Sequence, residues 1–93
     1  MRLSDFQIQT IKQTIYAVDA DTKIYLFGSR TNDDAKGGDI DLLVLSKKIG
    51  LKEQLNIKLR LYDQLGEQKI DLLVTEQAHT TFQKMVMNEG ILL

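Results

Sequence analysis

The chain has 93 residues, of which 43% are hydrophobic and 27% charged, a composition typical of one small globular domain. Twelve Lys and Arg residues against 13 Asp and Glu give a net charge of −1, so no overall attraction to nucleic acid is indicated. The absence of cysteine excludes disulfides, thiolate zinc sites and cysteine nucleophiles. The N-terminus turns polar at once and no apolar run reaches the length of a membrane span, so we expect a cytoplasmic protein.

The N-terminal segment predicts a helix followed by a buried strand. Apolar residues recur there at helical spacing: Leu3, Ile8, Ile11, Ile15 and Val18. Ser4 and Gln7 form the pattern of a capping box, which places the helix over residues 4–18. The apolar run 24–27 ends at Gly28 and is typical of a buried strand. A polar, glycine-ended loop follows over residues 31–38, with one helical turn expected just after Gly28.

The second half of the chain predicts two strands and two helices. A strand over residues 39–45 precedes a helix over 51–65, whose apolar arc spans roughly 200° at about 100° per residue and is wider than one sheet contact needs. Residues 70–74 form the third strand. Thr75 can cap a last helix, which Gly90 ends. That helix carries three apolar residues: Phe82, Met85 and Val86. The apolar tail 91–93 has no assigned place.

An aspartate stands at the start of each of the last two strands, where an apolar residue would pack better. Alternate strand residues share a face, so Asp39 and Asp41 lie side by side, about 6.6 Å apart along the strand, a spacing that suits a shared pair of metal ions. Asp71 occupies the matching position in the second Ile-Asp-Leu-Leu-Val run, and a charge there is costly unless a metal or partner satisfies it. The alternative is that these carboxylates are solvated residues that merely start strands.

Gly28, Ser29 and Arg30 have the pattern of a phosphate-binding turn. Gly28 lets the backbone approach a phosphate, Ser29 begins a helical turn with free N–H groups, and Arg30 can add a charge-assisted contact. The alternatives are a simple strand-to-helix turn with a serine cap, and an arginine that pairs with the acidic loop.

Bringing these parts to one site fixes the expected topology. If Gly28 at the end of the first strand meets Asp39 at the start of the second, those strands are antiparallel. If Asp71 joins them, the second and third strands are parallel and the helix between them is the crossover. We therefore expect an α+β fold with a three-stranded mixed sheet and about four helices, forming a single domain over residues 1–93.

The three motifs together resemble those of the DNA polymerase β-type nucleotidyltransferase superfamily, and most closely its minimal nucleotidyltransferase (MNT) subgroup. They are Gly28-Ser29-Arg30, Asp39-Ile40-Asp41-Leu42 and Ile70-Asp71-Leu72. The resemblance implies that Asp39 and Asp41 ligate two Mg²⁺ ions and that Asp71 holds the catalytic ion. It also implies that Gly28, Ser29 and Arg30 bind the phosphates of ATP. Relatives often carry a second arginine where this chain has Asn32, which weakens the phosphate contact unless Lys36 compensates.

The resemblance further implies transfer of AMP from ATP to a hydroxyl of a partner protein. MNT proteins commonly act as the antitoxin of a helical HEPN-domain toxin, and this chain lacks the second domain that holds the acceptor in larger members. We therefore expect a homo- or hetero-oligomer. One alternative is a non-catalytic antitoxin that neutralises a HEPN partner by covering it. Another is transfer to a small molecule such as an antibiotic, against which the missing acceptor domain argues.

Overall fold

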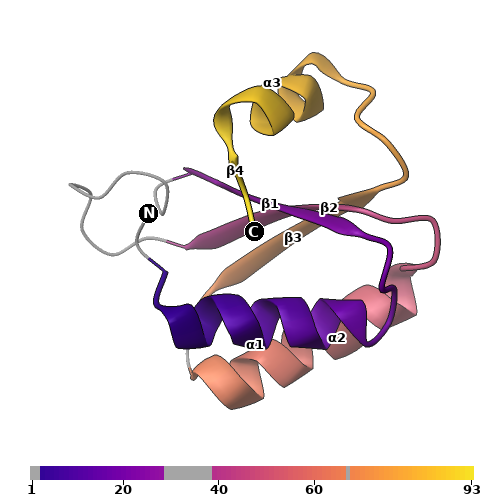
Figure 1. Cartoon of the computed structure of the whole chain (residues 1–93). Coiled ribbons are helices and arrows are strands. Elements are labelled where there is room, and N and C mark those ends of the chain that lie inside the picture. The colour runs from indigo at the N-terminus through magenta and orange to yellow at the C-terminus, as the bar shows by residue number, and fades with distance from the viewer. Residues whose placement is uncertain (1–2, 29–38, 67) are drawn as a thin grey trace.

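A computed structural model describes residues 3–28, 39–66 and 68–93 of the chain. Within these ranges three helices and four strands alternate along the sequence (Figure 1). Their bounds are α1 Asp5–Tyr16, β1 Lys23–Phe27, β2 Ile40–Leu45, α2 Leu51–Leu65, β3 Ile70–Thr75, α3 Thr81–Glu89 and β4 Ile91–Leu92. None of the helices in the described ranges has the length and apolar character needed to cross a membrane.

The strands form one mixed sheet in the order β3-β2-β1-β4. β1 is antiparallel to β2, and β2 is parallel to β3 with α2 as the connecting helix, which confirms the predicted α+β topology. The expected number of three strands is wrong, because the C-terminal tail adds β4. This strand pairs Ile91 with Leu26 and Leu92 with Tyr25. A strand of two residues is too short to show a periodic pattern in the sequence. β4 forms because the edge of β1 is open for pairing.

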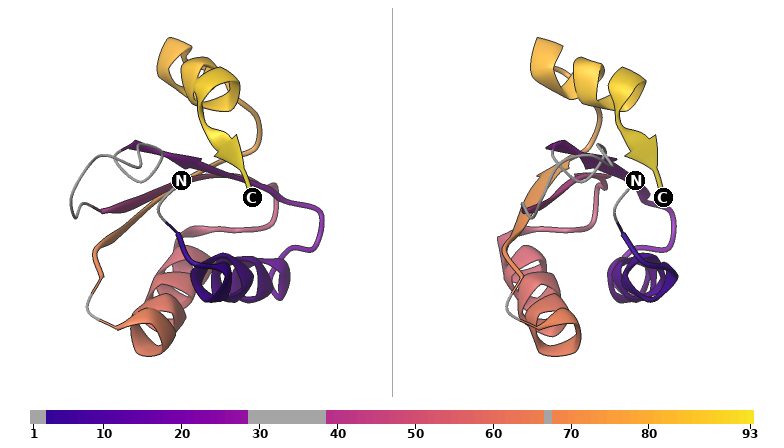
Figure 2. Two further views of the ribbon diagram at one scale, coloured as in Figure 1. Left: turned by 60° about the vertical axis from the view of Figure 1, so that its left-hand side comes forward. Right: turned by 90° about the vertical axis from the view of Figure 1, so that its left-hand side faces the viewer.

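Two layers of helix cover the sheet unequally. α1 and α2 lie together against one face, while α3 packs on the other (Figures 1 and 2). The main core fills the space between the sheet and the α1–α2 layer. Its buried residues are Leu3, Ile11, Ile15, Ile24, Leu26, Ile40, Leu42, Val44, Ile49, Ile57, Leu61 and Ile70. A smaller cluster of Tyr25, Leu43 and Val86 lies under α3.

The alternation of side chains along β2 assigns each residue to one of these two faces. Leu42 belongs to the main core, whereas Leu43 belongs to the cluster under α3. Asp41 shares the face of Leu43, because residues two apart in a strand point the same way. α3 does not cover β3 to the same extent, and Leu73 stays 36% exposed there. The α3 face of the sheet is therefore open beside β3.

The helix ends follow from local capping. The predicted capping box of α1 is confirmed, since the Ser4 hydroxyl accepts from the Gln7 amide and the Gln7 side chain accepts from the Ser4 amide. The predicted cap of the last helix is wrong: Thr80 caps α3, while Thr75 ends β3. The helical turn expected just after Gly28 lies outside the described residues, so three helices are described where about four were expected.

The wide apolar arc of α2 divides into a buried and an exposed part. Ile57 and Leu61 are fully buried against the sheet. By contrast, Leu51 is 85% exposed, Leu55 58% and Leu59 56%. These three residues recur every four positions and form a row along the helix, the α2 leucine stripe. The α2 leucine stripe is therefore apolar surface that the fold of this chain does not bury.

Candidate active site

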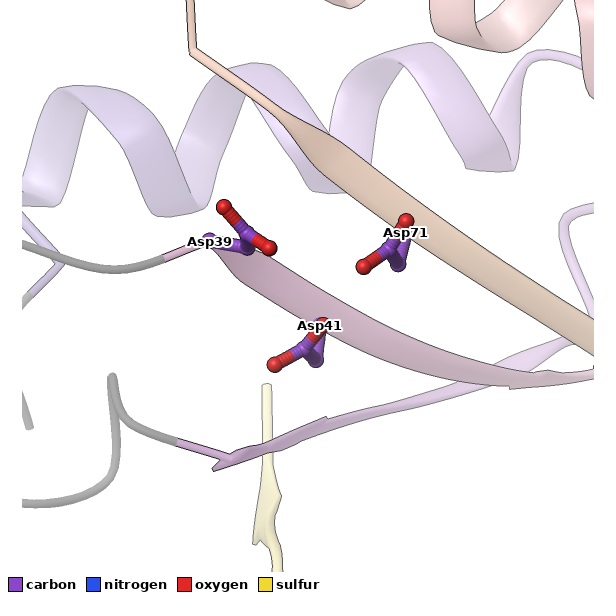
Figure 3. Close-up of side chains that lie close together, drawn as sticks. All are labelled: Asp39, Asp41 and Asp71. Atoms are coloured by element: carbon purple, nitrogen blue, oxygen red, sulfur yellow. The ribbon is translucent and has the colours of Figure 1, made fainter.

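The structure brings the three predicted aspartates together on the open face of the sheet. Asp41 lies opposite Asp71 in the parallel pairing of β2 with β3, and Asp39 directly precedes β2. One carboxylate oxygen from each residue lies within 4.8 Å of the others. Figure 3 shows the three side chains close together, with Asp39 at the start of β2, Asp41 on β2 and Asp71 on β3. The site is therefore at the end of the sheet where β2 and β3 begin.

The repeated Ile-Asp-Leu-Leu-Val sequence explains why the aspartates meet. Residues 40–44 pair in register with residues 70–74, so identical side chains lie side by side. Ile40 and Ile70 are both fully buried in the main core, and the aspartates that follow them point to the opposite face. The two runs differ in their place in the sheet, because β2 is a central strand and β3 is at the edge. Its Asp71 is accordingly exposed, whereas Asp39 and Asp41 are half-buried.

The electrostatics of the cluster centre on Asp41. Burial is the main cause that raises the pKa of Asp41 to about 6. A hydrogen bond with Asp71 and the negative charges of Asp71 and Asp39 act in the same direction, while the charge of Lys69 opposes them. Three carboxylates this close repel one another, so the cluster favours either a proton or a bound cation.

Lys69 is a residue of the site that the sequence analysis did not single out. Its ammonium nitrogen lies 3.5 Å from a carboxylate oxygen of Asp39. The negative charges of Asp39 and then Asp71 raise the pKa of Lys69. Its carbonyl also accepts the amide of Ile40 at 3.0 Å, which joins the starts of the two strands. In the sequence, the signal for this role is that Lys69 stands directly before Ile70 and Asp71. The pairing of β2 with β3 is what brings it close to Asp39.

Gly28 at the end of β1 is fitted to the carboxylate of Asp41. Its φ of +79° is in the left-handed region that favours glycine. A Cβ atom at this position would collide with the Oδ2 atom of Asp41. The phosphate-binding candidates Ser29 and Arg30, together with Asn32 and Lys36, lie outside the described residues, so their roles stay predictions.

The donor set fits a hard divalent cation. Magnesium and similar ions prefer carboxylate oxygens and bind through one or two protein carboxylates together with substrate phosphates. Here three carboxylates converge, and the negative charges of Asp71 and Asp39 add to the effect of burial on the pKa of Asp41, while the charge of Lys69 opposes them. The arrangement could hold such an ion, with Asp39, Asp41 and Asp71 as the candidate ligands.

Comparison with known proteins agrees with this geometry. A family model described as "Polymerase beta, Nucleotidyltransferase" matches residues 9–93. The matched region contains Gly28 and all three aspartates. No curated protein matches the chain. The mixed sheet and its helices are consistent with the fold of that family.

Proposed function

Because the chain belongs to the polymerase β nucleotidyltransferase family, we propose that it transfers AMP from ATP to a hydroxyl of a partner protein in a Mg²⁺-dependent reaction. The observation that carries the proposal is the convergence of Asp39, Asp41 and Asp71 within 4.8 Å beside the glycine turn. When bound, Mg²⁺ would neutralise triphosphate oxygens and lower the pKa of the acceptor hydroxyl.

The residues of this chain divide the work according to their places. Asp39 and Asp41 on the central strand would hold the ion, while Ser29 and Arg30 would bind the terminal phosphates of ATP. The carboxylate of Asp71 is the most exposed of the three, and it would orient the acceptor hydroxyl and accept its proton. The hydroxyl oxygen then bonds to the α-phosphorus, the bond from that phosphorus to the β-phosphate oxygen breaks, and pyrophosphate leaves with the electron pair.

We propose that the acceptor approaches from the open side of the site. β3 is an edge strand, and beside Asp71 its Leu73 is 36% exposed. A protein partner would dock here, and a HEPN-domain toxin is the partner we propose. Asp71 would then face the acceptor, with Asp41 between it and the nucleotide.

A radiolabel transfer assay tests this function. The purified chain is incubated with ATP labelled at the α-phosphate, Mg²⁺ and lysate of the source organism. Label is expected on a protein with the wild type and not with Asp39→Asn/Asp41→Asn, which has the same shape but cannot hold the ion. Label on nucleic acid or a small molecule would refute the proposed acceptor class. Label that persists with the double variant would refute the site.

The α2 leucine stripe favours a second candidate, a non-catalytic antitoxin that neutralises its partner by binding. Its three leucines are largely exposed on a helix of the α1–α2 layer, on the opposite face of the sheet from the aspartates. A partner seated on the stripe would leave the aspartates uncovered. Capture of a HEPN-domain protein from the same lysate by the wild type and the double variant alike, without label on any molecule, would favour this candidate.

A further inference from the structure

A pocket of about 310 Å³ lies between β1 and α3, on the same face of the sheet as the aspartates. The residues that line it include Phe27, Gly28, Phe82, Met85, Val86 and Glu89. Two of them are large apolar side chains without full cover: Phe82 is 47% exposed and Met85 45%. α3 thus presents part of its apolar surface to an open space, while its Val86 is buried.

The pocket is continuous with the candidate active site. Phe27 lies opposite Asp41 in the pairing of β1 with β2, and Gly28 both lines the pocket and approaches the carboxylate of Asp41. Across the sheet the order is therefore Asp71 on β3, Asp41 on β2, and then the pocket at β1. The pocket is on the side of the site where the phosphate-binding turn begins, and away from the exposed Asp71.

The chemistry of the lining suits a flat heteroaromatic ring. Phe27 and Phe82 pack edge to face, with ring centroids 5.7 Å apart and planes at 81°. The wall of the pocket therefore already contains an aromatic contact of the kind that a bound ring would make. The Met85 thioether is an adaptable partner for another ring. Glu89 adds a carboxylate, which can accept hydrogen bonds from the amino group of a base. A triphosphate alone would find no cation among these lining residues.

We infer that this pocket binds the nucleobase of the nucleotide whose phosphates lie at the aspartates. The inference rests on the proposed function, to which it adds the base-binding residues. With the phosphates near Gly28, the ribose spans the short path to the pocket and the base lies against Phe82 and Met85, with its amino group toward Glu89. An acceptor side chain is the less suitable occupant, because the pocket is separated from Asp71 by the width of β2.

Methyl NMR of the methionines tests the position of the base directly. The chain has three methionines, of which Met85 lines the pocket, while Met87 packs with the cluster under α3 and serves as an internal reference. With Mg²⁺ present, saturating ATP is expected to shift the Met85 methyl resonance through the ring current of the base. Tripolyphosphate, which has no base, is expected to leave it in place. An unshifted Met85 at an ATP concentration that saturates binding would overturn the inference.

Affinity measurements separate the base from the phosphates. Phe82→Ala is expected to weaken ATP binding at least about fivefold and tripolyphosphate binding less than about twofold, since base stacking on one aromatic side chain accounts for a loss of this order. Phe6→Ala is the matched control, because Phe6 is 65% exposed on α1, across the sheet from the pocket. Equal losses for both ligands, or unchanged ATP affinity, would refute the assignment to the base.

The same measurements distinguish failure of the inference from failure of the proposed function. No binding of either ATP or tripolyphosphate to the wild type would refute the nucleotide site as a whole. ATP binding that depends on Asp39 and Asp41 but not on Phe82 would refute the pocket assignment alone. Because no acceptor is present in these binding experiments, absence of transfer activity does not enter their outcome.

Discussion

Asp41 is the residue through which the parts of the site act on one another. Its carboxylate hydrogen-bonds with Asp71, faces the charge of Asp39, and occupies the space that the missing side chain of Gly28 leaves. A carboxylate in this position is stable in its charged form only near a positive charge. Lys69 supplies one, but it only partly opposes the rise in the pKa of Asp41. Burial first, and then the neighbouring carboxylates, raise the pKa of Asp41 to about 6, so a bound cation would favour the charged form of this residue.

Gly28→Ala tests the fit between the turn and Asp41. The new methyl group would displace the carboxylate of Asp41 and force a backbone conformation that alanine rarely adopts. We expect a loss of about 1–3 kcal/mol in the free energy of unfolding, together with Mg²⁺ binding weakened by about tenfold or more, as when ligand-orienting contacts are lost. Urea titration and calorimetric metal titration measure the two effects.

Gly66→Ala is the matched control for this variant. Gly66 has a similar φ of +83°, but a Cβ atom there would have nothing within 4 Å. Gly66→Ala is expected to lose stability through backbone strain and to retain wild-type Mg²⁺ affinity. If both variants bind Mg²⁺ as the wild type does, the close approach of Gly28 to Asp41 has no role in the site.

At the scale of a single element, α2 separates core packing from surface chemistry along one helix. Leu61 is fully buried, whereas Leu59, two positions before it, is 56% exposed. Leu61→Ala is expected to lower the free energy of unfolding by about 2–5 kcal/mol through lost burial and a cavity. Leu59→Ala is expected to change it by less than about 0.5 kcal/mol.

Urea denaturation of the two variants measures this difference. A large cost for Leu59→Ala in the isolated chain would mean that the stripe is already covered in solution by a second copy. Sedimentation velocity on the same samples would then show an assembly that the variant weakens.

How far the elements could be predicted depended on how local their determinants are. The capping box of α1 and the bounds of α2 follow from neighbouring residues, and both were confirmed. β4 depends on pairing across the sheet with the open edge of β1. The cap of α3, by contrast, is a local capping box of Thr80 and Gln83, the same pattern as that of Ser4 and Gln7, so the sequence contained the signal for it. The proximity of the aspartates could be predicted from the sequence, because the two Ile-Asp-Leu-Leu-Val runs pair in a single register. The pocket under α3 could not, since periodicity does not say which apolar residues of a helix remain uncovered.

At the scale of the whole molecule, ionisable groups with opposite effects on stability lie at the two ends of the sheet. Near the start of β1, the buried carboxylate of Asp19 accepts hydrogen bonds from the Ser46 hydroxyl at 2.5 Å and from the Asp21 amide at 3.0 Å. The hydrogen bond from Ser46, then that from Asp21, lowers the pKa of Asp19, an effect that outweighs its burial. Asp19 therefore stabilises the fold in its charged form, whereas Asp41 at the other end is more stable protonated.

The signs of these shifts give the metal-free protein an acidic optimum of stability. Because the pKa of Asp41 is about 6 in the folded state and 3.8 ordinarily, the folded state holds this proton more tightly, and stability rises as the pH falls from about 7 to about 4. The lowered pKa of Asp19 acts oppositely: its contribution is complete above about pH 4 and is lost as the pH falls further. The maximum is expected between about pH 4 and 5, with a gain over pH 7 of about 1 kcal/mol after allowance for solvent screening.

Urea titrations from pH 3 to 8, in EDTA and in saturating Mg²⁺, measure this profile and its reversal. Mg²⁺ requires the charged form of Asp41, so it is expected to stabilise the protein at pH 7 and to lose this effect as the pH falls through about 6. Asp41→Asn should remove both the rise in EDTA and the stabilisation by Mg²⁺, while Asp19→Asn should remove only the decline below about pH 4. If the stability of the wild type in EDTA falls steadily from pH 7 to pH 4, Asp41 does not take up a proton in the folded state. The carboxylate cluster would then have no electrostatic need for a cation.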